Sequence, residues 1–313
     1  MRKAIRILAK TLLFTLATLL LLGAAGYVYL YVLPKGPDVS EVKPLEEGKD
    51  SFVMMAYTHN ERKSIRVHTY KPSTWKDGDQ LVMVMHGGGR NGDDYRDAWV
   101  ELAEENNLLV VAPEFENKFA HITTNDYQEG NLFTFFGTAN PKEEWAYTVV
   151  ENIFDHVKST NGITNDSYAL FGHSAGGQFI HRMVMLMPEA RISTAVAANA
   201  GFYTLPDDKL AFPYGMKNTD TEVAENLPNA YQKRLIVLLG ELDNDPSLGT
   251  FRTTEQAMAQ GGHRLARGSY FFQANQTLAQ EKGWPLNWSI DTVPQVGHNY
   301  REMSAHAVKW LVE

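Results

Sequence analysis

A serine stands between two glycines in the stretch Gly172-His173-Ser174-Ala175-Gly176, which has the pattern G-x-S-x-G. The apolar run SYALFG before it is typical of a strand, and AGGQFIHRMVMLM after it is typical of a helix. A serine at such a tight turn needs small neighbours, and the helix start beneath it offers N–H groups to a developing oxyanion. A serine that only caps a helix would not need a glycine on each side. The pattern therefore predicts Ser174 as a nucleophile and the N–H of Ala175 as an oxyanion donor.

A serine hydroxyl needs a base, and the base needs an acid to orient it. The acid predicted here is Asp243, which lies three residues beyond the apolar run RLIVLLG in the polar turn ELDNDP. Asp245 and Glu241 in the same turn are its rivals. The predicted base is His298, which follows a glycine in a loop before the last predicted helix. The order serine, acid, histidine is the one expected when a nucleophile follows a strand in this way.

A second oxyanion donor is predicted in the run HGGGR, which begins at His86 after a buried strand. Glycines let backbone N–H groups approach a substrate oxygen, so Gly88 is paired with Ala175 as the donor set, and His86 and Gly87 are expected to line the substrate. The alternative for this run is a plain glycine turn. Arg90 could bind a substrate carboxylate, but pairing with the aspartates that follow it is favoured.

Substrate preference is expected to depend on loops near the site, namely residues 115–139 and 201–218. Their aromatic residues either form an apolar pocket or pack within the loops, and both alternatives stay open. His173 likewise either lines the pocket or fills the turn, whereas His181 is expected to be a packing residue. The residues predicted to contact substrate are His86, Gly87, His173, Phe202 and Tyr203, with Phe212 and Tyr214 as further aromatic candidates.

Composition argues against several other classes of function. The chain has no cysteine, no H-E-x-x-H motif and no Walker loop, so neither a metal nor a cofactor is expected. Its formal net charge is −8, and because four positive charges precede residue 11, the remainder carries −12. Nucleic-acid binding is therefore not expected, since phosphate contacts need a high density of Lys and Arg.

The N-terminal region predicts a membrane helix. Residues 11–34 carry no charge and are nearly all apolar, and about 20 such residues span a bilayer. A cleaved signal peptide is the alternative, with Gly23-Ala24-Ala25 before the cut. We favour an uncleaved anchor because the apolar run continues through Val32, with tyrosines that suit the membrane interface.

Four basic residues before the apolar run place the N-terminus in the cytoplasm and the rest of the chain outside it. The expected location is a bacterial inner membrane crossed once, with the body on the periplasmic or extracellular side. The predicted divisions are a basic segment (1–10), a signal-anchor (11–34), a polar linker (35–50) and a catalytic domain (51–313).

Strand-like and helix-like segments alternate along the body. This alternation predicts an α/β fold with a mainly parallel sheet covered by helices on both faces, and a site at the carboxyl ends of its strands. Residues 51–57 and 64–72 are expected to form an antiparallel start, and residues 116–140 a long ordered loop. Further strands are predicted at 80–86, 108–115, 167–172, 193–201, 233–240 and 287–295, and helices at 93–107, 141–159, 175–187, 267–283 and 301–312.

The segments MHGGGRNGDDYRDAW, GHSAGGQF, LLGELDND and VPQVGHNY together resemble the α/β-hydrolase superfamily, over about residues 53–312. Within it the chain is most similar to the esterase group of polyhydroxybutyrate depolymerases and feruloyl esterases, and to an uncharacterised bacterial branch. The resemblance implies Ser174 as nucleophile, His298 as general base and acid, and Asp243 as the orienting carboxylate. Secreted polymer depolymerases usually carry cysteines and a linker to a polymer-binding module, which this sequence does not show, so a soluble ester or small acyl compound is favoured as substrate.

The sequence thus predicts a serine hydrolase that cleaves a carboxylic ester through an acyl-enzyme. An acyltransferase, a thioesterase or a peptidase would use the same triad. A third alternative is a non-catalytic envelope protein on a hydrolase fold that binds another membrane protein.

Overall fold

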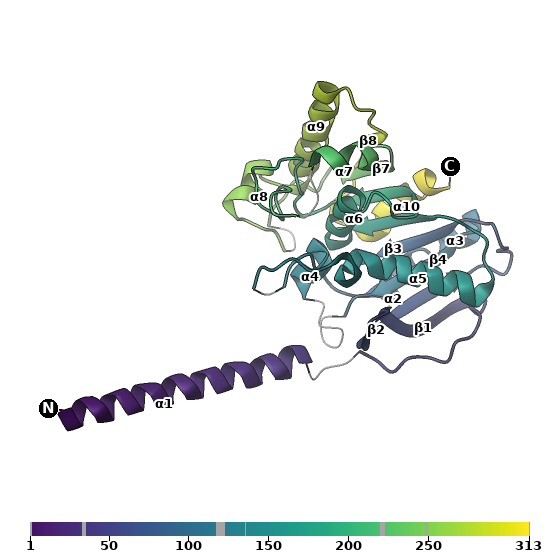
Figure 1. The fold of residues 1–313 in the computed structure, drawn as a ribbon. Helices are drawn as coiled ribbons and strands as arrows, with labels where there is room; N and C mark the ends of the chain where they lie inside the picture. Colours follow the sequence, from purple (N-terminus) through teal and green to yellow (C-terminus); the bar gives the residue numbers. More distant parts are fainter. Residues whose placement is uncertain are drawn as a thin grey trace.

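The computed structural model describes residues 2–32, 36–116, 123–134, 136–219, 223–247 and 250–312 (Figure 1). Among these residues, eight strands form one sheet in the order β1-β2-β4-β3-β5-β6-β7-β8. The strands are β1 (Gly48–Tyr57), β2 (Asn60–Lys71), β3 (Leu81–Met85), β4 (Leu109–Glu114), β5 (Tyr168–His173), β6 (Ile192–Ala198), β7 (Arg234–Gly240) and β8 (Trp288–Val293).

The sheet is antiparallel at one edge and parallel elsewhere. β2 pairs antiparallel with β1 and with β4, and every other pair along the order is parallel. The predicted antiparallel start and the mainly parallel sheet are therefore confirmed. The parallel strands β3 and β5 are mainly apolar and are buried along their whole length, as expected of strands covered on both faces.

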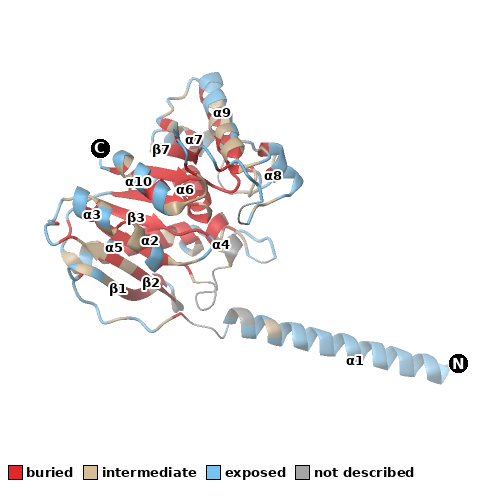
Figure 2. Ribbon diagram, turned by 180° about the vertical axis from the view of Figure 1, so that it is seen from behind, coloured by how far each residue is buried: buried red, intermediate tan, exposed pale blue. Residues whose placement is uncertain are grey.

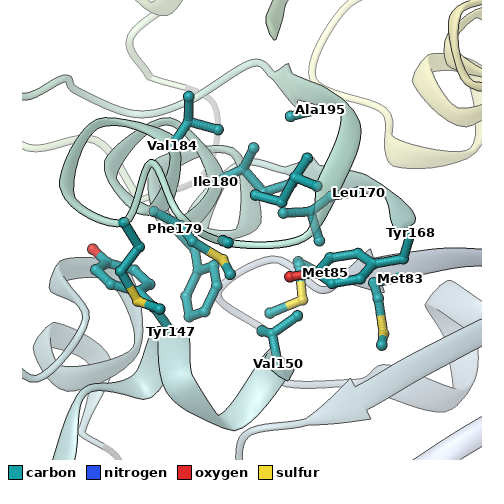
Figure 3. Close-up of a cluster of buried hydrophobic side chains, with 14 of the residues drawn as sticks. Met83, Met85, Tyr147, Val150, Tyr168, Leu170, Phe179, Ile180, Val184 and Ala195 are labelled. Atoms are coloured by element: carbon teal, nitrogen blue, oxygen red, sulfur yellow. The ribbon is translucent and has the colours of Figure 1, made fainter. Parts of the chain in front are cut away.

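Helices cover both faces of the sheet and divide the core in two. On one face, the core cluster contains Met83 and Met85 together with residues of α5, α6, α7 and α9. On the other face, the core cluster contains Val82 and Val84 together with residues of α2, α3 and α10. Figure 2 shows the buried sheet between these exposed outer surfaces, and Figure 3 shows the contact of α6 with the first face. The helices are α2 (Gly92–Ala98), α3 (Val100–Asn106), α4 (Thr124–Glu129), α5 (Ala146–Asn161), α6 (Ala175–Leu186), α7 (Val223–Ala230), α8 (Glu255–Gln260), α9 (Arg264–Lys282) and α10 (Tyr300–Leu311).

Several helix boundaries differ from the sequence-based expectation. The helix predicted at 93–107 is two helices, because the chain turns at the fully buried Trp99 between α2 and α3. The helix predicted from Pro141 begins only at Ala146, after a 3₁₀ turn (Lys142–Glu144).

Three short helices were not expected. α4 interrupts the predicted loop 116–140, and a capping box at Thr123 begins it; residues 117–122 and 135 of that loop lie outside the described residues. α7 contains Pro228 and α8 has six residues, so neither gives a clear helical period in the sequence.

The N-terminal segment forms one helix, α1 (Arg2–Tyr27), followed by a π-helical turn (Val28–Val32). None of the residues of α1 is buried (Figure 2). Its 26 residues extend about 39 Å, which is enough to cross a bilayer. By length and composition it is a candidate membrane span, and a signal sequence would have the same character.

The packing of α5 on the sheet predicts a large cost for truncating its buried face. Ile153 is fully buried on this helix, so Ile153→Ala should lower the free energy of unfolding by about 2–5 kcal/mol. Ser159→Ala, at an exposed position of the same helix, should change it by less than about 0.5 kcal/mol. Urea unfolding of both variants in detergent measures the difference, and equal stabilities would contradict the packing described.

Candidate active site

Ser174 occupies a strained turn between β5 and α6. Its backbone has φ 58° and ψ −111°, a conformation that is costly for a residue with a side chain. The turn is held because the Ser174 N–H donates to the Ala198 carbonyl at 2.9 Å, and its carbonyl accepts from Gln178 N at 3.0 Å. Its side chain makes no capping hydrogen bond to α6. The hydroxyl is therefore presented to the site, and the capping alternative is excluded.

The glycines of the motif allow this turn because neighbouring backbone lies too close for a side chain. A Cβ atom on Gly176 would lie 2.3 Å from the Met85 carbonyl oxygen, and one on Gly172 would lie 2.6 Å from the Gly176 carbonyl carbon. The start of α6 is thus pressed against the end of β3. Ala175 is the first residue of α6, so its N–H has no acceptor within the helix.

Three side chains from three separate loops form a hydrogen-bonded line. His298 Nε2 lies 3.0 Å from Ser174 Oγ, and His298 Nδ1 lies 2.7 Å from Asp243 Oδ2. The Asp243 side chain is fully buried, and that of His298 is 19% exposed. The structure therefore brings together the residues predicted as nucleophile, base and acid.

The two alternative acids, Asp245 and Glu241, bind other residues of their own surroundings. The Asp245 carboxylate accepts hydrogen bonds from Ser247 at the surface, and Glu241 accepts from the backbone and side chain of Gln295. Both side chains belong to exposed residues. Among the three carboxylates of this turn, it is Asp243 that reaches His298.

Asn199, at the end of β6, ties the loops together and was not predicted. Its side-chain oxygen accepts from Gly240 N at 2.8 Å, and its Nδ2 donates to the Gly297 carbonyl at 3.1 Å. Leu242 N also donates to the Val296 carbonyl at 2.8 Å. The acid loop and the histidine loop are therefore fixed to each other. Asn199 lies inside the strand predicted at 193–201, and the observed strand ends one residue before it, so no sequence signal marked its position.

His173 packs beneath the ring of His298. The two ring centroids are 4.4 Å apart, and the Tyr95 hydroxyl lies 3.2 Å from His173 Nδ1. Burial, and secondarily the nearby His298, lower the pKa of His173 well below its usual value. His173 is thus a neutral support for His298. Of the two alternatives for this residue, the structure supports packing within the turn, and Tyr95 is a partner that the sequence did not reveal.

The glycine-rich loop lies beside Ser174. A Cβ atom on Gly87 would be 3.7 Å from Ser174 Cβ and 2.7 Å from the Tyr95 hydroxyl. Gly88 is exposed, and nothing lies within 4 Å of the position of its missing Cβ. Gly87 is thus packed between Tyr95 and the nucleophile, and the exposed Gly88 follows it in the same loop.

His86 does not line this space, which corrects its predicted role. Its side chain is fully buried: Nδ1 bonds to the Gly87 carbonyl at 2.8 Å, and Nε2 accepts from Phe115 N at 3.0 Å. Burial lowers the pKa of His86 to about 4. Arg90 donates to the Phe115 carbonyl and lies over the Tyr127 ring, 4.9 Å from its centroid. Both side chains thus fasten the glycine loop to the segment after β4.

Phe202 and Tyr203 are also packing residues, so their predicted contact with substrate is corrected. Phe202 is 1% exposed, and the Cζ atoms of Arg182 and Arg252 lie over its ring, 4.5 and 4.3 Å from the ring centroid. Tyr203 is fully buried and stacks on Phe271 with centroids 4.6 Å apart. Both rings are covered because the loop after β6 folds back onto α6 and α9.

The other predicted side chains have local partners. Phe212 packs on Phe133, and the Tyr214 hydroxyl lies 2.6 Å from Thr254 Oγ1. His181 is buried and bonds through both ring nitrogens, to the Gly177 carbonyl and to Thr204 N, which confirms it as a packing residue. Within the described ranges, no group of three or more His, Asp or Glu side chains could hold a metal ion.

Two solved structures match this chain closely. Poly(aspartic acid) hydrolase-1 from Sphingomonas sp. KT-1 is 39% identical with a TM-score of 0.82, and the match covers 86% of this chain and 100% of the other. LpqC, a poly(3-hydroxybutyrate) depolymerase from Bordetella parapertussis, is 31% identical with a TM-score of 0.79, covering 84% and 89%.

More distant matches share the fold. The fluorophosphonate-binding serine hydrolase FphF of Staphylococcus aureus is 14% identical with a TM-score of 0.54, over 85% of this chain and 99% of the other. No protein-family model matches, and no curated protein sequence matches.

The close approach at Gly176 predicts that a single methyl group will disrupt the turn. Gly176→Ala should lower the free energy of unfolding by about 3 kcal/mol, because rigid backbone on β3 leaves the methyl no space. Gly88→Ala is the matched control: it faces open space and should change stability by less than about 0.5 kcal/mol. Urea unfolding compares them, and a Gly176→Ala protein as stable as wild type would disprove the contact.

The buried histidines predict that stability falls in weak acid. His86, His173 and His181 stay neutral in the folded protein because burial lowers the pKa of each, whereas the unfolded chain takes up protons near pH 6.5. Stability is therefore full above pH 6.5 and is lost as pH falls toward 4, by about 1.4 kcal/mol per pH unit for each histidine. Unfolding free energies measured from pH 7.5 to 5 should decline, and His306→Gln, at an exposed position, should leave the slope unchanged. A flat curve would refute this account.

Proposed function

This chain belongs to the α/β-hydrolase family of serine hydrolases that includes poly(aspartic acid) hydrolase-1 and LpqC poly(3-hydroxybutyrate) depolymerase, and on that basis we propose that Ser174 cleaves a carboxylic ester through an acyl-enzyme. The chain is a hydrolase by this membership. The proposal adds which residues act, by which mechanism and on which kind of bond.

The observation that carries the proposal is the line from Asp243 through His298 to Ser174, with separations of 2.7 and 3.0 Å. The carboxylate accepts from His298 Nδ1–H, which leaves Nε2 free to take the Ser174 proton as Oγ attacks the carbonyl carbon. The charged imidazole that results is stabilised by the same buried carboxylate. His298 then gives the proton to the leaving alcohol, so that the acyl group remains on Ser174.

The N–H groups of Ala175 and Gly88 are proposed to hold the oxyanion. The Ala175 N–H has no acceptor within α6 and lies at the positive end of that helix. Gly88 follows Gly87, whose backbone lies beside Ser174. In the second half of the reaction, His298 would take a proton from water as its oxygen attacks the acyl carbon, and the same N–H groups would bind the oxyanion. Collapse of this intermediate would break the bond between the acyl carbon and Ser174 Oγ and release the carboxylic acid, while His298 returns the proton to Oγ.

A small or soluble ester is the proposed substrate. Poly(aspartic acid), whose units are joined by amide bonds, is a second candidate, because 86% of the chain matches a hydrolase of that polymer at 39% identity. A thioesterase, a peptidase or an acyltransferase would need the same three side chains. Product analysis with added alcohol or amine acceptors separates hydrolysis from transfer.

The helix α1 is proposed to act as a retained anchor. Residues 1–10 would lie in the cytoplasm, residues 11–34 in the membrane and residues 35–50 in a linker outside it, followed by the catalytic domain (51–313). The apolar length of α1 and the four basic residues before its apolar run support this arrangement. A cleaved signal remains the alternative, and the mass of the mature protein distinguishes the two.

The triad predicts a steep loss of activity on substitution. Ser174→Ala and His298→Ala should abolish labelling by a fluorophosphonate probe and lower kcat for nitrophenyl esters by about 10⁴-fold or more. Asp243→Asn should lower kcat by about 10⁴-fold, because the amide favours the wrong tautomer of His298. Hydrolysis of esters of graded acyl length, measured spectrophotometrically, gives these values.

Asp245→Asn is the matched control in the same turn and should retain the wild-type rate. Ester hydrolysis that persists in Ser174→Ala would refute the proposal. Absence of labelling in folded wild-type protein would instead favour the non-catalytic alternative.

A further inference from the structure

A second charged side chain holds the buried carboxylate of Asp243. Arg264 Nη1 lies 3.3 Å from Asp243 Oδ1, the oxygen that does not face His298. Exposure of the two side chains is 2% for Arg264 and 0% for Asp243. The carboxylate thus has a guanidinium on one oxygen and an imidazole on the other, and little of this arrangement contacts water.

Arg264 is fixed by its own surroundings. It is the first residue of α9, and Nη2 donates to the Thr250 carbonyl at 2.9 Å. The next residue, Leu265, donates its N–H to the Asp243 carbonyl oxygen at 3.2 Å. The first turn of α9 therefore binds both the side chain and the backbone of Asp243, so the guanidinium cannot move independently of the acid loop.

The energetic consequence follows from burial. A carboxylate without water around it is costly to keep charged unless it is paired and hydrogen-bonded. While His298 is neutral, Arg264 is the positive group that is paired with Asp243. Its hydrogen bond also opposes rotation of the carboxylate, which would turn Oδ2 away from His298 Nδ1.

We propose that Arg264 is a positioning residue of this triad, which holds Asp243 charged and oriented so that His298 keeps the tautomer and direction needed to reach Ser174. The inference rests on the proposed function, because it concerns how that triad is maintained. In the described part of the chain, Arg264 meets the triad at Asp243, so its effect on the reaction passes through that carboxylate.

Arg267 provides a matched control on the same helix. It is fully buried one turn later and binds the same region, since Nη2 donates to the Arg252 carbonyl, Nη1 to the Gly201 carbonyl and Nε to the Gly261 carbonyl. Both guanidinium groups also stack on the Phe251 ring. Arg267 differs from Arg264 in that these hydrogen bonds go to backbone carbonyls, whereas Arg264 also pairs with the carboxylate of Asp243. Substituting each arginine in turn therefore distinguishes an effect on the folding of the surrounding loops from an effect on the Asp243 carboxylate.

The test is a double-mutant cycle in the full-length protein in detergent. Arg264→Met should lower kcat for a nitrophenyl ester by about 10- to 100-fold with little change in KM, because the interaction serves proton transfer and not substrate binding. In an Asp243→Ala background the same substitution should cost less than about twofold, since the carboxylate through which Arg264 acts is gone. Arg264→Lys should fall between wild type and Arg264→Met, because it keeps the charge but loses the planar fork.

Arg267→Met should lower the melting temperature while keeping kcat within about twofold of wild type. Equal losses from Arg264→Met in both backgrounds, or a wild-type kcat in Arg264→Met, would overturn the inference. If Arg264→Met fails to fold, the loss of kcat caused by Arg264→Lys is measured in the wild-type and Asp243→Ala backgrounds. Equal losses in the two backgrounds would again overturn the inference. Failure of the proposed function is separate, because it would appear as ester hydrolysis that does not depend on Ser174.

Discussion

The close contact between the start of α6 and the end of β3 is the constraint on which the site depends. Gly176 approaches the Met85 carbonyl so closely that no side chain fits, and this contact holds Ser174 at φ 58°. The strained turn is maintained by the packing of α6 on the sheet and by the hydrogen bond from Ser174 to the Ala198 carbonyl. The scaffold and the nucleophile are thus one structural unit, since loosening the helix would release the serine.

Around this turn, the site consists mainly of buried polar groups that position one another. Asn199 joins the ends of β6, β7 and the histidine loop, while His173 and Tyr95 support the ring of His298. Low exposure makes each hydrogen bond hard to replace by water. A buried network of this kind keeps its geometry before substrate arrives, which is the condition for electrostatic stabilisation of a transition state.

The aromatic residues of the loops show how an apolar pattern can mislead. Phe202 and Tyr203 follow shortly after β6, yet the Phe202 ring is covered by two arginines and the Tyr203 ring stacks on Phe271 of α9. Large aromatic side chains are equally suited to a pocket wall and to a loop core. The prediction for His86 is wrong in the same way. Its imidazole is buried and hydrogen-bonds to the Gly87 carbonyl and to Phe115 N in the segment after β4.

The sequence by itself determined the class of fold and the mainly parallel sheet, and it predicted Ser174, Asp243 and His298 while Asp245 and Glu241 stayed open as rivals of Asp243. Those features depend on local patterns: apolar runs that must be buried, and glycines spaced around Ser174. Only the tertiary structure decided that Asp243, and not Asp245, reaches His298, because residues two apart in a turn point in different directions. It also decided that Arg264, far along the chain, shares that carboxylate. Such a pairing depends on how α9 packs against β7, and no local spacing encodes it.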